Sequence, residues 1–368
     1  MRLLVINGPN LNLLGERQPE VYGSATLADL EDQVAVWGDE MDLNVDSEQT
    51  NSEERVIELI QTYDGDGVVL NPGAFTHTSR AIADAITAVS TPVVEVHISN
   101  VRAREPWRAR SVMSEVCART IYGRGIGGYR NAMRHLVNRA VMPFETVRYG
   151  PHPDNVGDLR CGDGDLVVLA HGGLWSQEFE RDLTESLAVD LTERGYHTWN
   201  IEYRRVGYGG GWPASGQDVL TALDSIPQLG IDPRRVILVG HSAGAQLLMW
   251  AAPRAETRAS LHVALGPLLD LRTAAGSGDV GGVECRRMLD QGAPPSVGPA
   301  GVETVLVHGD ADQIVPVERS IEYAGEHGLE HHRTGCDHFS LLDPIKPEWA
   351  WVIDRISDGD SPAPNRET

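Results

Sequence analysis

The sequence is poor in lysine, and its basic side chains are outnumbered by acidic ones. Lys346 is the only lysine, and the chain carries 31 basic against 53 acidic residues, for a formal net charge of −22. Such an acidic surface repels phosphate backbones, which excludes nucleic acid as an expected partner. The sequence also contains no apolar run near the length of a bilayer-spanning helix, so we expect no membrane partner.

Cysteine is scarce as well. The four cysteines, at positions 117, 161, 285 and 336, form no CxxC pair, which argues against a zinc or redox site. The first ten residues, MRLLVINGPN, lack the pattern of a secretory signal peptide, which is a charged segment followed by an apolar stretch and a small-residue cleavage site. These features predict a cytoplasmic protein without a metal site.

Short apolar runs alternate with helical patterns over residues 1–142, which we assign to a first domain. Strands are predicted at 3–6, 43–49, 67–71, 92–99 and 119–123, and helices at 26–37, 52–63, 78–89 and 128–139. Strands that alternate with helices indicate a parallel sheet with both faces covered. The predicted fold class of this half is therefore α/β.

The periodicity fails over residues 143–165, where Pro, Gly and Asp accumulate. We interpret this segment as a linker that leads into a second domain over residues 147–356. There the runs LVVLAHGG, HTWNIEYR, RVILVGHS and TVLVHGD predict a second α/β sheet. The last residues, 357–368, are rich in Ser, Asp and Pro and are predicted to be a disordered tail.

Polar residues follow three of the predicted strands in the first half. In a doubly wound sheet, the carboxyl ends of the strands are where ligands bind. The residues at these ends are Asn10, Arg17 and Tyr22 after the first strand, Asn71 and His77 after the third, and His97, Ser99 and Arg108 after the fourth. Packing alone does not require such a concentration of polar side chains, so we expect a binding site there.

The segments GPNLNLLGERQPEVYG, LNPGAFTHTS and EVHISNVRARE resemble, in order and spacing, the signatures of the type II 3-dehydroquinate dehydratases. The resemblance covers residues 1–140. It implies a flavodoxin-like domain that converts 3-dehydroquinate to 3-dehydroshikimate, in the shikimate or quinate pathway, without metal or cofactor. It also implies a homo-oligomer built from trimers, a dodecamer being the usual assembly of the family.

The same resemblance implies roles for individual residues. Tyr22 would be the base and Arg17 would stabilise its charged state, since a phenol titrates near pH ~10 and becomes a base only beside cations. Asn10 would orient a water at the enolate oxygen, and His97 would protonate the leaving hydroxyl. The residues that would hold the substrate are Asn71, His77, Ile98, Ser99 and Arg108, with Asp84 reaching across from a neighbouring subunit.

The second half contains a candidate serine nucleophile. Gly240-His241-Ser242-Ala243-Gly244 lies between a predicted strand and a predicted helix, the context of a nucleophile elbow. Upstream, His171-Gly172-Gly173 follows a strand, as in the oxyanion loops of esterases, so the backbone N–H groups of Gly173 or Leu174 with that of Ala243 would hold an oxyanion. Downstream come Asp310, Asp312 and then His338, in the order Ser…Asp…His of α/β-hydrolases.

HGGLW, WNIEYRRVGYGGGWP, VGHSAGAQLLMWAA and HGDADQIVP resemble the kynurenine-formamidase-like and carboxylesterase-like α/β-hydrolases over residues 147–356. The resemblance favours Asp312, just before the VP of its loop, as the triad acid. It implies a serine hydrolase with Ser242 and His338, acting on a small ester or formamide. The alternative is a dehydratase whose hydrolase-like half is a non-catalytic module that shapes assembly.

Overall fold

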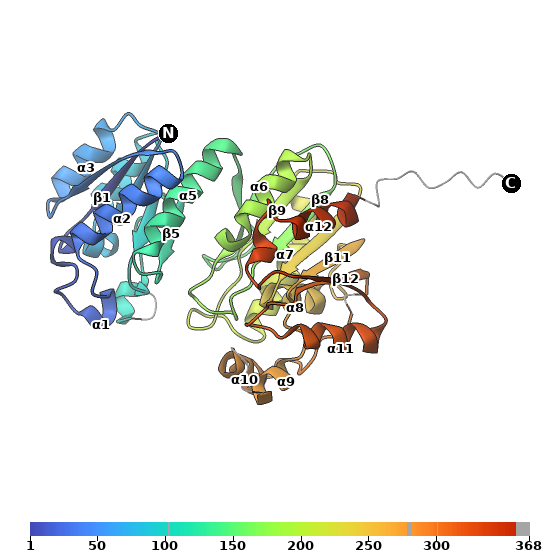
Figure 1. Ribbon diagram of the computed structural model, residues 1–368. Coiled ribbons are helices and arrows are strands. Elements are labelled where there is room, and N and C mark those ends of the chain that lie inside the picture. The colour runs from blue at the N-terminus through green and yellow to red at the C-terminus, as the bar shows by residue number, and fades with distance from the viewer. Residues whose placement is uncertain (102–103, 278–280, 300, 358–368) are drawn as a thin grey trace. The chain divides into compact units, whose positions relative to one another are not determined.

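Residues 1–101, 104–277, 281–299 and 301–357 are described by the computed structural model of the chain. The chain divides into two units, Met1–Val141 and Met142–Thr368 (Figure 1), which we call unit 1 and unit 2. Most of the predicted tail, residues 358–368, lies outside the described residues; Ser357 is the last residue of a helix. Across the described ranges, every helix is too short or too polar to span a bilayer.

Unit 1 is built on a parallel sheet with strand order β2-β1-β3-β4-β5. Its strands are β1 (Arg2–Asn7), β2 (Asn44–Gln49), β3 (Gly67–Asn71), β4 (Val93–His97) and β5 (Arg119–Tyr122). Its helices are α1 (Pro19–Tyr22), α2 (Leu27–Glu40), α3 (Glu53–Thr62), α4 (Arg80–Thr87) and α5 (Gly127–Val141). The parallel sheet predicted for this half is confirmed.

Two apolar clusters hold the helices against the two faces of this sheet. Alternate strand residues such as Leu3 and Val5 pack with α2 and α5, whereas Leu4 and Ile6 pack with α3 and α4. The inner strands are buried on both faces, which explains their continuous apolar sequences. Helix starts are capped as well: Thr26 accepts from the backbone of Asp29, and Asp29 accepts from Thr26 in return.

Within the described residues, unit 2 has an eight-stranded sheet of order β13-β12-β11-β10-β8-β9-β7-β6. The strands are β6 (Glu145–Arg148), β7 (Val156–Arg160), β8 (Leu166–Ala170), β9 (His197–Ile201), β10 (Val236–His241), β11 (Leu261–Leu265), β12 (Glu303–Gly309) and β13 (Glu330–Thr334). Neighbours from β13 to β9 are parallel, while β7 is antiparallel to both β9 and β6. The predicted α/β fold of this half is thus confirmed, as a mixed sheet.

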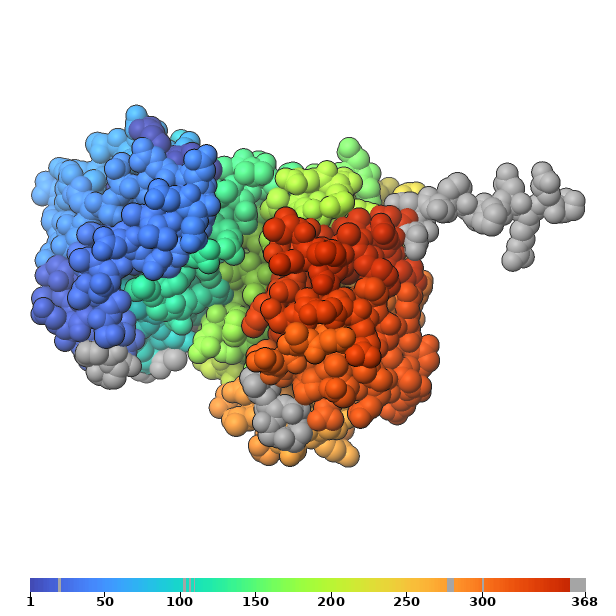
Figure 2. All heavy atoms as spheres, viewed as in Figure 1, coloured from blue at the N-terminus to red at the C-terminus, as the bar shows by residue number. Residues whose placement is uncertain are grey.

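Helices cover both faces of the second sheet. They are α6 (Glu185–Glu193), α7 (Ala214–Ser225), α8 (Ala243–Ala251), α9 (Leu271–Ser277), α10 (Gly282–Asp290), α11 (Val317–His327) and α12 (Pro347–Ser357). One apolar cluster joins the sheet to α6 and α12, and a larger one joins its other face to α7, α8, α10 and α11. In the space-filling view, the C-terminal segments in orange and red form much of the visible surface of unit 2 (Figure 2).

Segment 143–165, in which the sequence shows no periodicity, contains β6 and β7 as an antiparallel pair. Strand β7 buries Asp158 and Arg160, which form ion pairs with Arg181 and Glu185 respectively. These charged side chains replace the apolar alternation by which a strand is normally detected. For this reason the sequence analysis did not predict these two strands of the unit 2 sheet, which lie where the linker leads into the second domain.

Candidate active sites

Unit 1 contains a cavity of about 90 Å³ at the carboxyl ends of β1, β3 and β4. The predicted residues that line it are Asn10, Arg17, Tyr22, Asn71, His77, His97, Ile98, Ser99 and Arg108. They come together because the parallel strands that carry them end at one edge of the sheet.

Tyr22 lies between two arginines in this cavity. Arg104 donates a hydrogen bond of 2.6 Å from Nη1 to the Tyr22 hydroxyl, and its guanidinium carbon lies 5.4 Å from the ring centroid. The guanidinium carbon of Arg17 lies 5.8 Å from the same centroid. Two cations at this distance stabilise negative charge on the phenol oxygen. The sequence prediction included Arg17 and missed Arg104, because three arginines in VRAREPWR give no signal of which one turns inward.

His97 ends β4 and is held by a buried carboxylate. Its Nε2 lies 2.8 Å from Oε1 of Glu95, and both side chains are buried. Glu95 also accepts from the hydroxyls of Ser111 and Thr120. Burial would raise its pKa, but the hydrogen bonds from His97, Thr76 and Thr120 hold it below the usual range. An ionised Glu95 fixes the proton of His97 on Nε2 when the ring is neutral, which leaves Nδ1 for a ligand.

Glu95 is a second residue that the sequence prediction missed. It lies two positions before His97, so the period of a strand places both side chains on one face of the sheet. An acid inside the otherwise apolar run VVEVH was the available signal.

His77 and Arg108 line the same cavity. The Nδ1 of His77 lies 2.8 Å from the carbonyl oxygen of Arg110, so this nitrogen carries the hydrogen and Nε2 is an acceptor. Burial lowers the pKa of His77, which favours the neutral ring. Arg108 donates to Glu105 at 2.9 Å and stacks over Trp107, with 4.1 Å from its guanidinium carbon to the ring centroid.

The two asparagines are fixed by hydrogen bonds within unit 1. Asn71, at the end of β3, donates from Nδ2 to the Tyr129 hydroxyl at 2.8 Å and accepts from the backbone of Gly73. Asn10 has φ of 68°, the left-handed region that asparagine tolerates, and its backbone N–H donates to Asn51 at 2.9 Å.

Asp84 is the predicted site residue that the cavity does not include. It is exposed on α4 and lines a separate surface hollow with Arg80, Arg110 and Glu115. A role for Asp84 in the cavity therefore requires a second copy of the chain.

In unit 2, Ser242 occupies a sharp turn between β10 and α8. Its φ of 51° and ψ of −117° are rare for a residue with a side chain, and it is 1% exposed. Both glycines of the GHSAG motif are required because a side chain at either position would clash with neighbouring backbone. A Cβ on Gly240 would lie 2.5 Å from Cα of Ala245, and one on Gly244 would lie 2.3 Å from the carbonyl oxygen of Ala170. The turn fits the nucleophile elbow predicted from GHSAG.

His338 and Asp312 lie beside this turn. The Nδ1 of His338 lies 2.6 Å from Oδ2 of Asp312, and both side chains are buried. The backbone N–H of Ser242 donates to Leu265, and the next residue, Gly266, lies so close that a Cβ there would be 3.0 Å from Nδ1 of His338. Serine, histidine and aspartate thus converge around residues 265–266.

The environment of Asp312 differs from that of Asp310. Asp312 accepts from the backbone of Ile314 and Val315, and its Oδ2 also lies 3.1 Å from Nε2 of His308. Burial would raise its pKa, but the hydrogen bonds of His308 and His338 hold it well below the usual range. Asp310 is instead exposed and ion-paired with Arg333.

The loop after β8 lies against the turn that holds Ser242. A Cβ on Gly172 would lie 2.8 Å from Cβ of Ser242. Gly173, Leu174 and Trp175 follow with φ of 102°, 53° and 56°. Ala243 is the first residue of α8, so its N–H has no acceptor within the helix. The three predicted donors, at Gly173, Leu174 and Ala243, therefore lie on two segments that approach Ser242.

The described residues contain no group of three or more His, Cys, Asp or Glu side chains placed to hold a metal ion. Trp175 is fully buried in the apolar core of unit 2, whereas Trp212 is partly buried against that core.

Comparison with known proteins follows the same division of the chain. The sequence model of the family described as Dehydroquinase class II matches residues 1–137. The 3-dehydroquinate dehydratase of Deinococcus radiodurans is 52% identical over 137 residues, which are 36% of this chain and 96% of that protein. The chain belongs to the type II dehydroquinase family. The catabolic 3-dehydroquinase 1 of Aspergillus terreus is 49% identical to the dehydroquinase unit over 136 residues, 36% of this chain and 90% of the relative.

A second family model, BD-FAE, matches residues 160–269 of the same chain. The crystal structure of esterase LipW from Mycobacterium marinum is similar with a TM-score of 0.52 and 19% identity, covering 65% of this chain and 89% of the esterase. This likeness establishes the fold: the dehydroquinase unit is followed by a domain with the α/β-hydrolase fold.

Proposed function

We propose that unit 1 dehydrates 3-dehydroquinate to 3-dehydroshikimate. The observation that carries this proposal is the position of Tyr22, whose hydroxyl accepts from Arg104 in a cavity that also contains His97. A phenol stabilised as its anion is a base, and a histidine across the cavity is an acid. These are the groups that an elimination next to a ketone requires, and the family relatives are named for this reaction.

In the proposed mechanism, the Tyr22 phenolate removes the proton next to the ketone, and the electron pair forms an enolate. Asn10 orients a water that donates to the enolate oxygen. The enolate then collapses to form the carbon–carbon double bond, and the carbon–hydroxyl bond breaks as the imidazolium form of His97 delivers its Nδ1 proton to the departing oxygen. Water leaves, and the proton on Tyr22 passes through solvent to Nδ1 of His97, which restores both groups.

The remaining cavity residues hold the substrate in this proposal. His77 accepts a substrate hydroxyl at Nε2, and Arg108 pairs with the carboxylate. Asn71 and the backbone at Ile98 and Ser99 hold the other polar groups. No cofactor takes part in any of these steps.

Asp84 enters the site only through assembly. We infer a cytoplasmic homo-oligomer built from trimers, with a dodecamer as the complete form. In it, Asp84 of one chain reaches the cavity of the next, which its exposed position on α4 supports.

For unit 2 we propose a serine hydrolase that cleaves a small ester or formamide. The observation that carries it is the contact of His338 with Asp312 beside the strained turn of Ser242. His338 donates from Nδ1 to Asp312, so Nε2 is the nitrogen that can take the Ser242 proton. A non-catalytic module has no physical need for a buried serine in a left-handed turn.

In this mechanism, Ser242 attacks the acyl carbon while His338 takes its proton and Asp312 stabilises the imidazolium. The carbonyl oxygen becomes an oxyanion held by the N–H groups of Ala243 and of Gly173 or Leu174. His338 then protonates the leaving alcohol or amine, and water hydrolyses the acyl-enzyme by the same route.

Because both proposed activities belong to one chain, the activity of the unmutated unit serves as a control in each variant. Tyr22→Phe is expected to abolish turnover of 3-dehydroquinate, and Ser242→Ala to abolish labelling by a fluorophosphonate, detected as one adduct per chain by intact mass. Each variant should retain the activity of the other unit. A Tyr22→Phe protein with most of its dehydratase turnover would contradict the first assignment. An unlabelled wild-type protein that still dehydrates would instead favour a non-catalytic role for unit 2.

A further inference from the structure

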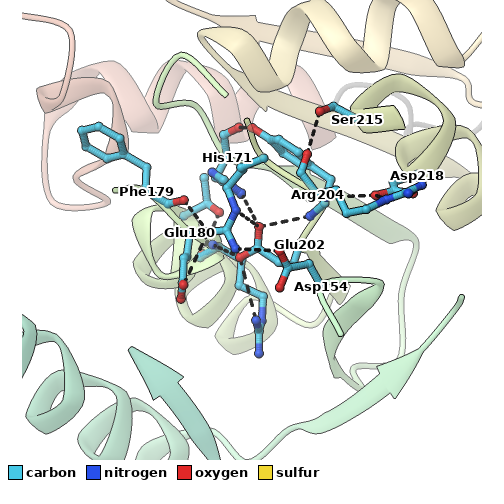
Figure 3. A network of polar contacts seen from close by, with 12 residues as sticks. Asp154, His171, Phe179, Glu180, Glu202, Arg204, Ser215 and Asp218 are labelled. Atoms are coloured by element: carbon cyan, nitrogen blue, oxygen red, sulfur yellow. Dashed lines mark hydrogen bonds and ion pairs between the residues drawn. The ribbon is translucent and has the colours of Figure 1, made fainter. Parts of the chain in front are cut away.

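Two neighbouring strands of unit 2 place a histidine and a glutamate opposite each other, at the start of the loop that carries the proposed oxyanion donors. Strands β8 and β9 pair in parallel with Ala170 opposite Ile201, and the next residues are His171 and Glu202. The Nε2 of His171 lies 2.8 Å from Oε1 of Glu202, and both side chains are buried. Figure 3 shows the two side chains pointing toward each other within a larger network of polar contacts.

Both ring nitrogens of His171 are next to acceptors. Nδ1 lies 2.7 Å from the carbonyl oxygen of Gly172, which can only accept, while Nε2 lies next to Glu202. The His171 ring therefore links the Gly172 carbonyl to the Glu202 carboxylate.

The surroundings of Glu202 keep it ionised. Its Oε1 accepts from the backbone of Tyr203 at 3.0 Å, and its Oε2 accepts from the backbone of Arg181 at 3.1 Å. The guanidinium of Arg205 lies 3.5 Å from Oε1. A carboxylate that accepts several hydrogen bonds beside a buried cation stays in its charged form.

The contact to Gly172 sets the direction of the following amide. In a planar trans peptide, the C=O of Gly172 and the N–H of Gly173 point in opposite directions. Since His171 holds the Gly172 carbonyl, the Gly173 N–H is turned away from the His171 ring. Gly172 itself lies against Ser242, so this amide is delivered to the neighbourhood of the nucleophile.

The same network holds the far end of the loop. Arg205 donates from Nη1 to the carbonyl oxygen of Phe179 at 2.7 Å, and it pairs with Asp154 and Glu180. The side chain of Phe179 fills the space beside Gly173, where a Cβ would lie 2.3 Å from that of Phe179. Between these anchors, Leu174 and Trp175 have positive φ, a conformation that persists only when the surroundings fix it.

We propose that Glu202 is a positioning residue for the hydrolase reaction: through the ring of His171 it fixes the peptide that presents the Gly173 N–H to the oxyanion. The role rests on the hydrolase activity proposed for Ser242. Ring stacking reinforces it, because Tyr203 lies parallel to His171 at 4.4 Å between centroids and donates to the carbonyl oxygen of His171.

The test compares two Glu→Gln substitutions in unit 2, assayed in the full chain with p-nitrophenyl acetate. Glu202→Gln removes the charge under the oxyanion loop. Glu185→Gln is the matched control, since it removes the charge from another buried ion pair, with Arg160 at 3.1 Å. An oxyanion donor acts in the transition state, so Glu202→Gln should lower kcat by about 10- to 100-fold with little change in KM. Glu185→Gln should leave both constants near those of the wild type.

A second variant keeps the proposal testable if the Glu202→Gln protein does not fold. His171→Gln breaks the same link from the loop side and leaves Glu202 with Arg205 and Arg181, and it should lower kcat to a similar extent. Folding of each variant is checked by its near-ultraviolet circular dichroism. The proposal is overturned if either folded variant retains the wild-type kcat, if only KM changes, or if Glu185→Gln loses as much kcat.

The outcome also separates this role from the hydrolase assignment. If wild type and Ser242→Ala hydrolyse p-nitrophenyl acetate equally, the hydrolase assignment fails and the role of Glu202 fails with it. If Ser242→Ala is inactive and Glu202→Gln is as active as wild type, the hydrolase assignment stands and only the role of Glu202 is overturned.

Discussion

Arg104 donates a hydrogen bond of 2.6 Å to the hydroxyl of Tyr22, although 82 positions separate the two residues in the chain. The tyrosine belongs to the short helix α1 and the arginine to the segment after β4. The guanidinium carbon of Arg17 lies 5.8 Å from the centroid of the same ring. Two segments that are distant in the sequence thus bring arginines to one tyrosine.

The contact predicts that Arg104→Gln impairs dehydration. The variant keeps a hydrogen-bond donor but loses the cation, so we expect kcat for 3-dehydroquinate to fall by about 100-fold. Arg130→Gln is the matched control, because Arg130 pairs with the exposed Glu40 on the surface of unit 1. Steady-state assays measure kcat for 3-dehydroquinate in both variants. Equal kcat values would show that Arg104 has no role in the reaction.

Glu95 is expected to act through His97. Glu95→Gln keeps the shape of the side chain but allows its amide to donate, so the proton of His97 is no longer fixed on Nε2. We expect kcat to fall by about 10- to 100-fold with little change in KM, because proton delivery and not substrate binding is affected. A change confined to KM would instead place Glu95 in substrate binding.

The choice between two aspartates can be tested directly. Asp312→Asn should lower hydrolase turnover by about 10³- to 10⁴-fold, because the amide no longer holds and stabilises the His338 imidazolium. Asp310→Asn should have little effect, since Asp310 is exposed and pairs with Arg333. The rate of fluorophosphonate labelling measures both variants. Greater loss in Asp310→Asn would reverse the assignment.

His262 predicts acid sensitivity of unit 2. Its ring is fully buried on β11, neither nitrogen has a hydrogen-bond partner among the described residues, and burial lowers its pKa to about 3. Because the folded-state pKa lies below the ordinary value near 6.5, the unfolded chain binds the proton more readily as pH falls through this window. His262 therefore lowers the free energy of unfolding by at most about 1.4 kcal/mol for each pH unit between roughly 6.5 and 3.

His262→Leu removes this dependence, since leucine has a similar volume and no proton to bind. Urea unfolding of unit 2 at pH 7 and at pH 5 should show a smaller loss of stability in the variant than in wild type. The same loss in both proteins would mean that His262 is solvated or paired in solution.

Apolar periodicity was sufficient to predict the main strands of both sheets. The runs LLVI and GVVLN in unit 1, and LVVLA and VILVG in unit 2, belong to inner strands and are buried on both faces. The two edge strands of the unit 2 sheet gave no such signal. Strand β6 is largely exposed, and β13 is polar, so neither has the pattern of a buried strand.

The residues of both sites were predicted where a motif fixes the local backbone. GHSAG specifies the Ser242 turn because steric contact at both glycines leaves no room for a side chain, and the polar loops after β1, β3 and β4 must meet at one sheet edge. Partners from distant segments were not predictable in this way. The contacts of Arg104 with Tyr22 and of Glu202 with His171 depend on side-chain direction.

The sequence by itself therefore determined two α/β domains, the order of their strands along the chain and the identity of most candidate catalytic groups. Only the tertiary structure decided that Arg104 contacts Tyr22, that Glu202 contacts His171, and that Asp84 lies outside the cavity of its own chain. The physical reason is that periodicity and motifs constrain the backbone locally, whereas charge pairs are chosen by packing between distant segments. The buried contact of His171 with Glu202 has no periodic signature, because it forms only where the strands that precede the two residues are aligned.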